Sequence, residues 1–289
     1  MLLWLFIGCA TSITSPSLCS GWSEPSPHGQ ISSSSLTEAS GLVASKLHDN
    51  LLWTHNDGDD GELFALNEDG SLRARMTLDG VEMEDWEDIA TGIGPDGRAW
   101  LFLGDTGDND EARETVSIWR LQEPEDVDLD QTLTGAEEFQ FTFPDGPEDT
   151  EALLYDPVTE HILLITKHND HANVYTASFE QADTPNTLQP TTVLDFSDPL
   201  YGEESAVTAA DATADNSMVV LRTESAILIY RADEVDSLVS TLSTTPCVAQ
   251  PADGEIAGEG LALQERRSGT FLYTLGEGSF AWLYRGSLD

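Results

Sequence analysis

The chain alternates between short apolar runs and short polar segments, and one arrangement of these segments occurs five times. In each copy a strand rich in small residues is followed by a polar turn and then by a strongly apolar strand that ends in a polar cluster. Short apolar runs bounded by Gly, Asp, Asn and Ser predict β-strands joined as hairpins. The copies begin at Glu38, Glu87, Glu151, Thr208 and Glu259.

Successive copies start 49 to 64 residues apart, a spacing typical of a four-stranded propeller blade. A third strand follows every copy and a fourth follows the first four. The fifth copy has none because the chain ends at Asp289. We expect residues 29–36 to supply the missing outer strand and so to close the ring, which removes open sheet edges.

The sequence therefore predicts an all-β fold, a five-bladed propeller of four-stranded blades over residues 29–289. Residues 1–28 are expected to hold an export signal and a flexible Ser/Pro-rich leader at about residues 12–27. A six-bladed ring, with a degenerate copy hidden between Glu87 and Glu151, is the alternative.

The apolar run at residues 1–7 is too short to span a bilayer and stops at Gly8 and Cys9. The run and its cysteine resemble a bacterial lipobox, although no Lys or Arg precedes them. This predicts lipidation at Cys9 and anchoring to the outer membrane, the periplasmic face or the cell surface. The alternative is an ordinary export signal cleaved near Ser20 and a fully secreted protein.

Two further cysteines, Cys19 and Cys247, remain after Cys9 is set aside. In an oxidising compartment they could form a disulfide that ties the N-terminal arm to the body. Two free thiols are the alternative, and the sequence does not decide between them.

The formal net charge is −41. Such a charge excludes nucleic acid as a partner and suits either cation capture or solvation in salt. The candidate partners are the membrane surface, reached through the lipid anchor, and a small molecule, glycan or protein, and we expect a monomer.

In a propeller the start of each inner strand and the end of the second strand lie on the same rim, because the two strands are antiparallel. Acidic and polar clusters occur at both of these places. Hard oxygen ligands in irregular number favour calcium over zinc. The candidate metal ligands are Glu38, Glu87, Asp88, Asp105, Asp108, Asn109 and Glu151. The candidate ligand-binding rim consists of His55, Asn56, Asp57, Asp85, Trp86, Lys167, His168, Asn169, Arg222, Glu259 and Glu277.

Each of these groups also has a purely structural interpretation. The strand-opening acids could accept backbone N–H bonds from the neighbouring blade and so hold the ring together. Asp105, Asp108 and Asn109 could stabilise a turn. The two histidines could serve only as hydrogen-bonding groups.

Four motifs in order, EASGL, LWTHND, DWEDIA and LGDTGDN, resemble a family of exported bacterial β-propeller proteins of unassigned function. The resemblance covers most of residues 38–277, and residues 85–90 with 104–109 are its most specific part. That family is distantly similar to NHL-type and gluconolactonase-like propellers, and the latter hold a divalent cation at the channel mouth. The resemblance thus implies a propeller and, by analogy, a cation at the rim.

Two functions fit these features. The first is a binding module that holds calcium at the rim and recognises a ligand there. The second is a metal-dependent hydrolase of lactones or phosphoesters, with Glu151 or His168 as general base. The catalytic residues of such an enzyme are otherwise unknown, because the sequence contains no nucleophile elbow, zinc-protease motif or phosphate-binding glycine loop.

Overall fold

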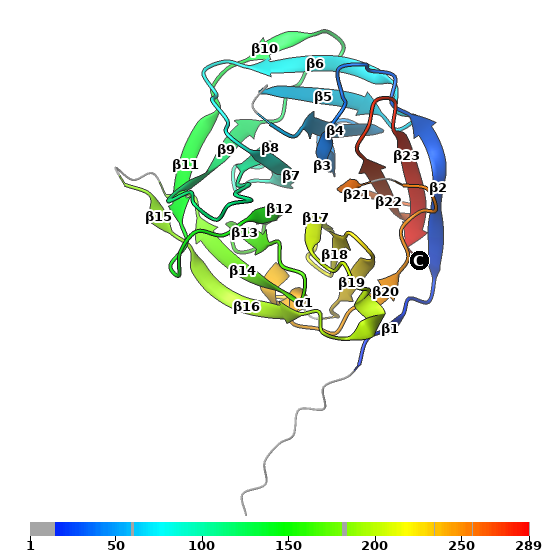
Figure 1. Ribbon diagram of the computed structural model, residues 1–289. Coiled ribbons are helices and arrows are strands. Elements are labelled where there is room, and N and C mark those ends of the chain that lie inside the picture. Colours follow the sequence, from blue (N-terminus) through cyan, green and yellow to red (C-terminus); the bar gives the residue numbers. More distant parts are fainter. Residues whose placement is uncertain (1–14, 59–60, 181–183, 234, 256, 289) are drawn as a thin grey trace, which may run out of the picture.

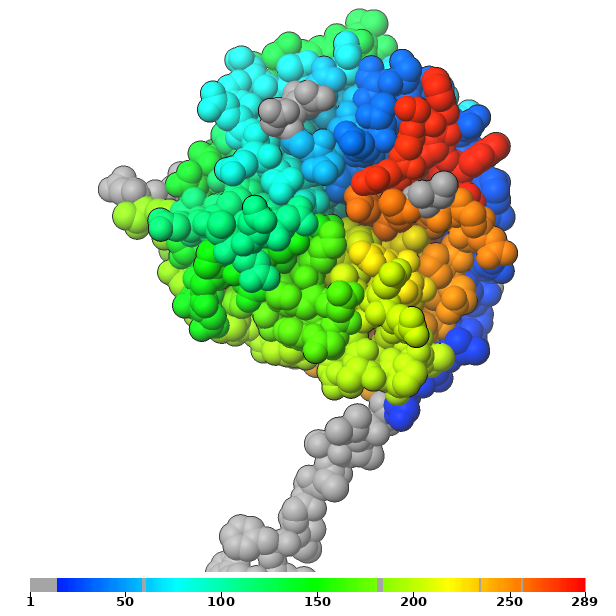
Figure 2. Space-filling view, in the orientation of Figure 1, coloured from blue at the N-terminus to red at the C-terminus, as the bar shows by residue number. Residues whose placement is uncertain are grey.

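The computed structural model describes residues 15–288 except 59–60, 181–183, 234 and 256, and these form five β-sheets around a central channel (Figure 1). The five-bladed propeller is therefore confirmed. In the space-filling view, side chains close most of the central opening that the ribbons leave (Figure 2).

The blades follow the chain from inner to outer strand. Blade 1 contains β3 (Ala39–Ala44), β4 (Leu51–Asn56), β5 (Glu62–Asn67) and β6 (Leu72–Leu78). Blade 2 contains β7 (Trp86–Ile93), β8 (Ala99–Asp105), β9 (Val116–Gln122) and β11 (Glu137–Thr142). Blade 3 contains β12 (Thr150–Asp156), β13 (His161–Thr166), β14 (His171–Ser178) and β16 (Gln189–Asp195). Blade 4 contains β17 (Val207–Ala212), β18 (Met218–Thr223), β19 (Ile227–Arg231) and β20 (Cys247–Ala249). Blade 5 contains β21 (Gly258–Arg266), β22 (Gly269–Gly276), β23 (Trp282–Leu288) and β2 (Trp22–Gln30).

In each blade, the turn between the first and second strands lies where the sequence changes from apolar to polar. Each of the five turns contains one residue with a positive φ angle, a backbone conformation that favours Gly and Asn. These residues are Asn50, Gly97, Glu160, Asn216 and Gly269.

The hydrophobic core is divided into five clusters, one at each contact between neighbouring blades. In β13, for example, Ile162 and Leu164 pack towards blade 2, whereas Leu163 and Ile165 pack towards blade 4. Side chains alternate between the two faces of a strand, so each of these sheets is buried on both faces. This explains why the second strands are continuous apolar runs and not alternating ones.

The ring closes through the N-terminus, but the closing strand begins earlier than the sequence suggested. β2 (Trp22–Gln30) pairs antiparallel with β23, and of the predicted residues 29–36 only Gly29 and Gln30 belong to that pairing. Pro25 and Pro27 made this segment look like a loop. An outermost strand tolerates proline because its outer N–H groups have no partner, and β2 has bulges at both prolines.

The predicted flexible leader is wrong for residues 17–18 and 22–27, which are paired in sheets. The segment from Ile31 to Leu36 instead enters the core between blades 5 and 1, where both of these side chains are 1% exposed. The lipobox with Cys9 lies outside the described residues.

Three blades carry a short fifth strand that runs parallel to their outer strand. β10 (Gln131–Leu133) pairs with β6, β15 (Asn186–Thr187) with β11, and β1 (Ser17–Leu18) with β20. The long interval between Glu87 and Glu151 therefore contains an edge-covering strand for blade 1, and the six-bladed alternative is wrong. The described helices are short, namely η1 (Pro199–Tyr201) and α1 (Leu238–Leu242), and none of them could cross a membrane.

Cys19 and Cys247 form a disulfide with a Cα–Cα distance of 4.9 Å. Cys247 begins β20, and Cys19 directly follows the strand β1 that pairs with it. The bond joins positions 228 residues apart and fixes the start of the N-terminal arm to blade 4 before the chain reaches blade 5.

Removing this disulfide should destabilise the protein by about 2–5 kcal/mol, because a large loop in the unfolded chain regains its freedom. We expect the Cys19→Ser/Cys247→Ser double variant and the reduced wild type to melt at the same lowered temperature in calorimetry. Cys9→Ser is the control and should melt like the wild type. A wild-type transition that reductant does not move would contradict this prediction.

Candidate functional site

The structure places the start of each inner strand beside the end of its second strand, as the antiparallel geometry requires. The first paired residues are Ala39 with Asn56 in blade 1, Trp86 with Asp105 in blade 2, and Thr150 with Thr166 in blade 3. Blades 4 and 5 repeat this arrangement. The polar clusters of the five blades therefore share one channel mouth.

Each inner strand has a register shift at its second or third residue, which leaves one residue unpaired. A bulge of this kind redirects the side chain of the extra residue. The five bulged residues are Gly41, Glu87, Glu151, Thr208 and Glu259. Three of the five blades thus present a glutamate at the same structural position of the mouth.

Glu38 is not one of these residues. The position that corresponds to Glu87 in blade 1 is Gly41, so the first sequence copy was aligned three residues out of phase. Glu38 precedes β3 and is exposed.

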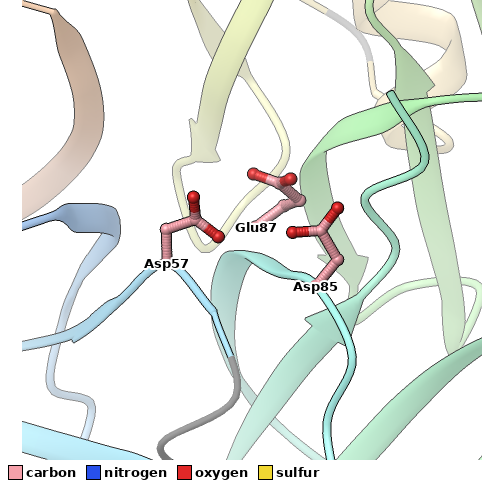
Figure 3. A group of neighbouring side chains, drawn as sticks. All are labelled: Asp57, Asp85 and Glu87. Atoms are coloured by element: carbon pink, nitrogen blue, oxygen red, sulfur yellow. The ribbon is translucent and has the colours of Figure 1, made fainter. Parts of the chain in front are cut away.

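Two groups of carboxylates meet at the mouth and have Glu87 in common. The first consists of Asp57, Asp85 and Glu87, whose ligand oxygens lie within 4.8 Å of one another and point together in Figure 3. The second consists of Glu87, Asp149 and Glu151. Blades 1, 2 and 3 all contribute to this acidic mouth.

Asp149 was missed in the sequence, although a signal for it exists. Asp85-Trp86-Glu87 and Asp149-Thr150-Glu151 are the same Asp-x-Glu motif at the head of β7 and of β12. Asp85 and Asp149 each stand two residues before a bulged glutamate, so both motifs deliver two carboxylates to the mouth.

The crowding of these acids changes their protonation. Burial, reinforced by Glu151 and Asp57, raises the pKa of Glu87 to about 10. Burial and the neighbouring Asp57 raise the pKa of Asp85 to about 6. Like charges in a poorly solvated site disfavour ionisation, so the mouth without a cation retains protons at neutral pH.

Lys167 neutralises one side of the mouth by an ion pair with Glu151. Burial raises the pKa of Glu151 to about 7, although Lys167 opposes that shift. Burial lowers the pKa of Lys167, but Glu151 and Asp149 outweigh it and the net pKa is raised. On blade 5, burial together with Glu151 and Glu277 raises the pKa of Glu259 to about 8.

Glu87 has no such partner. Glu87 is 5% exposed, and no described residue donates a hydrogen bond to its carboxylate. Gly107 lies against the carboxylates of Glu87 and Asp85, and a Cβ atom at this position would collide with both. The glycine of the GDTGDN motif therefore makes room for these two carboxylates, and a groove of about 630 Å³ adjoins Asp85 and Gly107.

The structure gives the predicted ligands Asp105 and Asp108 other contacts. Asp105 accepts the Asp85 N–H at 3.0 Å and the Arg113 guanidinium at 3.0 Å. Asp108 accepts the N–H groups of Ala112 and Arg113 at 2.9 and 2.7 Å. These contacts correspond to the turn-stabilising alternative, and Asn109 beside them is exposed.

Asp88 lies below the mouth and connects two blades. Its carboxylate accepts the N–H of Ile89 in its own strand and that of Leu153 in blade 3, both at 2.8 Å. Asp211 does the same between blades 4 and 5 through Ala212 and Leu263, both at 2.7 Å. The blade-joining role considered for the glutamates thus belongs to these two aspartates.

The remaining rim candidates fall into two sets. Lys167 and Glu277 lie beside the acidic mouth. The others have their own contacts: His55 stacks on Trp86 with ring centroids 4.2 Å apart, and Asn56 accepts the Thr37 N–H. His168 bonds to Glu148 at 2.9 Å and Arg222 to Glu255 at 2.7 Å, whereas Asn169 is exposed.

No family model matches the chain, and no curated protein is similar to it in sequence. Among solved structures, the β-propeller domain of Cps50 (Swd1) from Myceliophteria thermophila is 11% identical, with a TM-score of 0.46 over 92% of this chain and 100% of that one. A nidogen/laminin complex is also 11% identical, with a TM-score of 0.41 over 84% and 77%. The five sheets themselves define a five-bladed β-propeller, and its buried acidic groups at one channel mouth suit a binding module.

Asp211 provides a pH test of the blade contacts. Burial raises its pKa from 3.8 to about 6, although Lys46 and the two backbone amides oppose the shift and Glu265 adds to it. A raised folded-state pKa means that ionisation favours the unfolded chain, so stability is lost as pH rises from about 4 to 6. Relative to Asp211→Asn, the wild type should lose about 3 kcal/mol over this range in urea titrations.

The control is Asp215→Asn, on the exposed turn of the same blade. Hydrogen bonds from Ser217 lower the pKa of Asp215, so its contribution is lost only at more acidic pH. A wild type that kept a constant stability difference from Asp211→Asn between pH 4 and 7 would refute the assignment.

Proposed function

We propose that this protein is an exported binding module that holds a calcium ion at the acidic mouth and recognises a ligand beside it. The observation that carries the proposal is Glu87, a buried carboxylate without a partner among the described residues, at the point where two carboxylate groups meet. A cation there would offset the burial and the repulsion that raise the pKa of Glu87.

Asp57, Asp85 and Glu87 are the ligands that this proposal assigns to the ion. Carboxylate oxygens in an irregular arrangement suit calcium, which accepts variable geometry. Glu151 is already paired with Lys167, so the ion belongs on the Asp57 side. Gly107 supports this placement because its missing side chain leaves the carboxylates of Glu87 and Asp85 free to converge.

The ligand would approach from the groove beside Asp85. Asp57 is exposed, and the groove of about 630 Å³ reaches Gly107 and Asp85 from outside. An ion with one open side can accept an oxygen from a bound molecule, as a glycan or a protein carboxylate would supply.

The hydrolase alternative has less support in the geometry. Its two candidate general bases are both engaged, Glu151 by Lys167 and His168 by Glu148. A general base needs a free lone pair directed at the attacking water.

Calcium should raise the melting temperature of the wild type by about 5 °C when it is present at about 100 times its dissociation constant, and a chelator should reverse the shift. Glu87→Gln should lose this shift yet melt normally without calcium, because glutamine resembles the protonated acid that occupies the site now. Differential scanning fluorimetry over a calcium and EGTA series measures both effects.

The matched control is Glu38→Gln, which removes an exposed carboxylate from the same rim and should keep the full calcium shift. Calcium shifts of equal size in the wild type and Glu87→Gln would sink the assignment. Absence of any shift in the wild type at moderate salt would do the same.

Export and lipid anchoring belong to the same proposal. The disulfide supports export, because disulfides persist in oxidising compartments and are rare in the cytosol. It uses two of the three cysteines, which leaves Cys9 available for the lipid.

Expression of the full chain in a Gram-negative host with labelled palmitate tests the anchor. The wild type should incorporate label and sediment with membranes, and Cys9→Ser should do neither, since the sulfur carries the diacylglycerol. Unlabelled wild type in the culture medium would instead support the cleaved export signal.

A further inference from the structure

The outer edges of four blades are protected against further strand pairing. Blades 1, 2 and 4 carry the parallel fifth strands β10, β15 and β1. In blade 5 the outer strand β2 contains Pro25 and Pro27 and two bulges, which prevent a regular ladder. An unprotected edge would offer a template for another extended chain.

Blade 3 has no such protection. Its outermost strand is β16, and no strand lies outside it among the described residues (Figure 1). Pro190 interrupts the start of β16, but residues 191–195 contain no proline. Within the part of the chain that the structure describes, the second half of β16 is therefore a sheet edge with no strand paired to it.

The hydrogen-bond pattern shows which backbone groups face outwards. The Asn173 N–H donates to Thr166 Oγ1 in β13, so the backbone of Asn173 faces away from β16. Asn173 is opposite Val193, and in an antiparallel ladder both members of such a pair direct their N–H and C=O groups away from each other. The N–H and C=O of Val193 thus point out of the sheet edge, and its side chain is 60% exposed.

A cavity of about 550 Å³ runs along this edge. The four consecutive residues 192–195 all line it. Their side chains alternate between the two faces of the sheet, so all four can line one cavity only if it follows the backbone edge. Tyr201, Tyr230, Leu242 and Pro246 also line the cavity.

The charge of this cavity restricts its occupant. Asp195 and Asp198 line it, and its described lining includes no Lys, Arg or His. A second copy of a chain with a net charge of −41 would meet strong repulsion here, whereas a basic segment would be attracted.

We propose that the open edge of β16 is a docking site for an extended, basic segment of a partner protein, which adds a fifth strand to blade 3. The backbone of Val193 would bond to the segment, and the carboxylates of Asp195 and Asp198 would attract its cations. Its apolar side chains would contact the apolar residues that line the cavity. This is strand addition, the same pairing that β1, β10 and β15 provide within the chain.

A fluorescein-labelled peptide of about eight alternating Lys and Val residues is the probe. Fluorescence anisotropy should detect binding to the full-length wild type. Val193→Pro should weaken binding about tenfold, because it removes an outward N–H while the ladder to β14 loses no bond. The matched control Val193→Ala keeps the N–H and should bind within about threefold of the wild type.

Two further measurements keep the test independent of the variant's folding. A peptide with an N-methyl group on every residue should not bind the wild type, because neither of its edges keeps an N–H group that could pair with β16. Amide hydrogen exchange at residues 191–195 of the wild type should slow when the unmodified peptide is added.

Four outcomes would overturn the proposal. One is equal binding of the probe by a folded Val193→Pro variant, and another is equal binding of a Glu/Val peptide. A wild-type dimer in light scattering that Val193→Pro abolishes would show that a second copy docks instead. Binding that appears only after removal of the residues before Ser15, which with Pro16 lines the cavity, would identify the chain's own N-terminus as the occupant.

Discussion

The whole architecture depends on the contact between neighbouring blades. Each sheet is buried on both faces, and five separate apolar clusters hold the ring together. Asp88 and Asp211 add direct hydrogen bonds across two of these contacts. Every blade packs against two neighbours, so each apolar cluster forms only when both of the blades that share it have folded. The position of the channel mouth therefore depends on the whole ring.

The acidic mouth is a consequence of that arrangement. A bulge near the head of each inner strand brings the same position of each blade to the channel, and three blades place a glutamate there. The ring packing forces these glutamates together against their mutual repulsion. Lys167 forms an ion pair with Glu151, whereas no described cationic side chain forms an ion pair with Glu87. The two glutamates occupy the same structural position in their blades and yet differ in their partners.

The sequence predicted the five blades and the shared rim because repeated hydrophobic patterns are local signals. The sequence-based prediction was less accurate for features that depend on contacts between residues far apart in the chain. β2 was placed too late because its prolines are acceptable only at a sheet edge, and the edge exists only in the folded ring. Glu38 was aligned with Glu87 because a bulge cannot be recognised from residue spacing alone. The pairing of Cys19 with Cys247 depends on a distance that only the folded ring sets.

Asp149, by contrast, could have been predicted from the sequence. Its Asp-x-Glu motif repeats that of Asp85, so comparison of blades 2 and 3 position by position would have found it. For Asp105 and Asp108, acidity alone does not separate a metal ligand from a turn-stabilising residue. The decision depends on nearby N–H groups and on Arg113, and these contacts follow from the loop conformation.

The pairing of β2 with β23 joins segments at opposite ends of the propeller sequence. During synthesis β2 is made first, yet its partner at residues 282–288 is made only after the other four blades. Contacts this distant in sequence form slowly, since a long loop must close before they contribute. A nascent chain that lacks residues 282–288 therefore carries an incomplete fifth blade, and the ring can close only after these residues have been made.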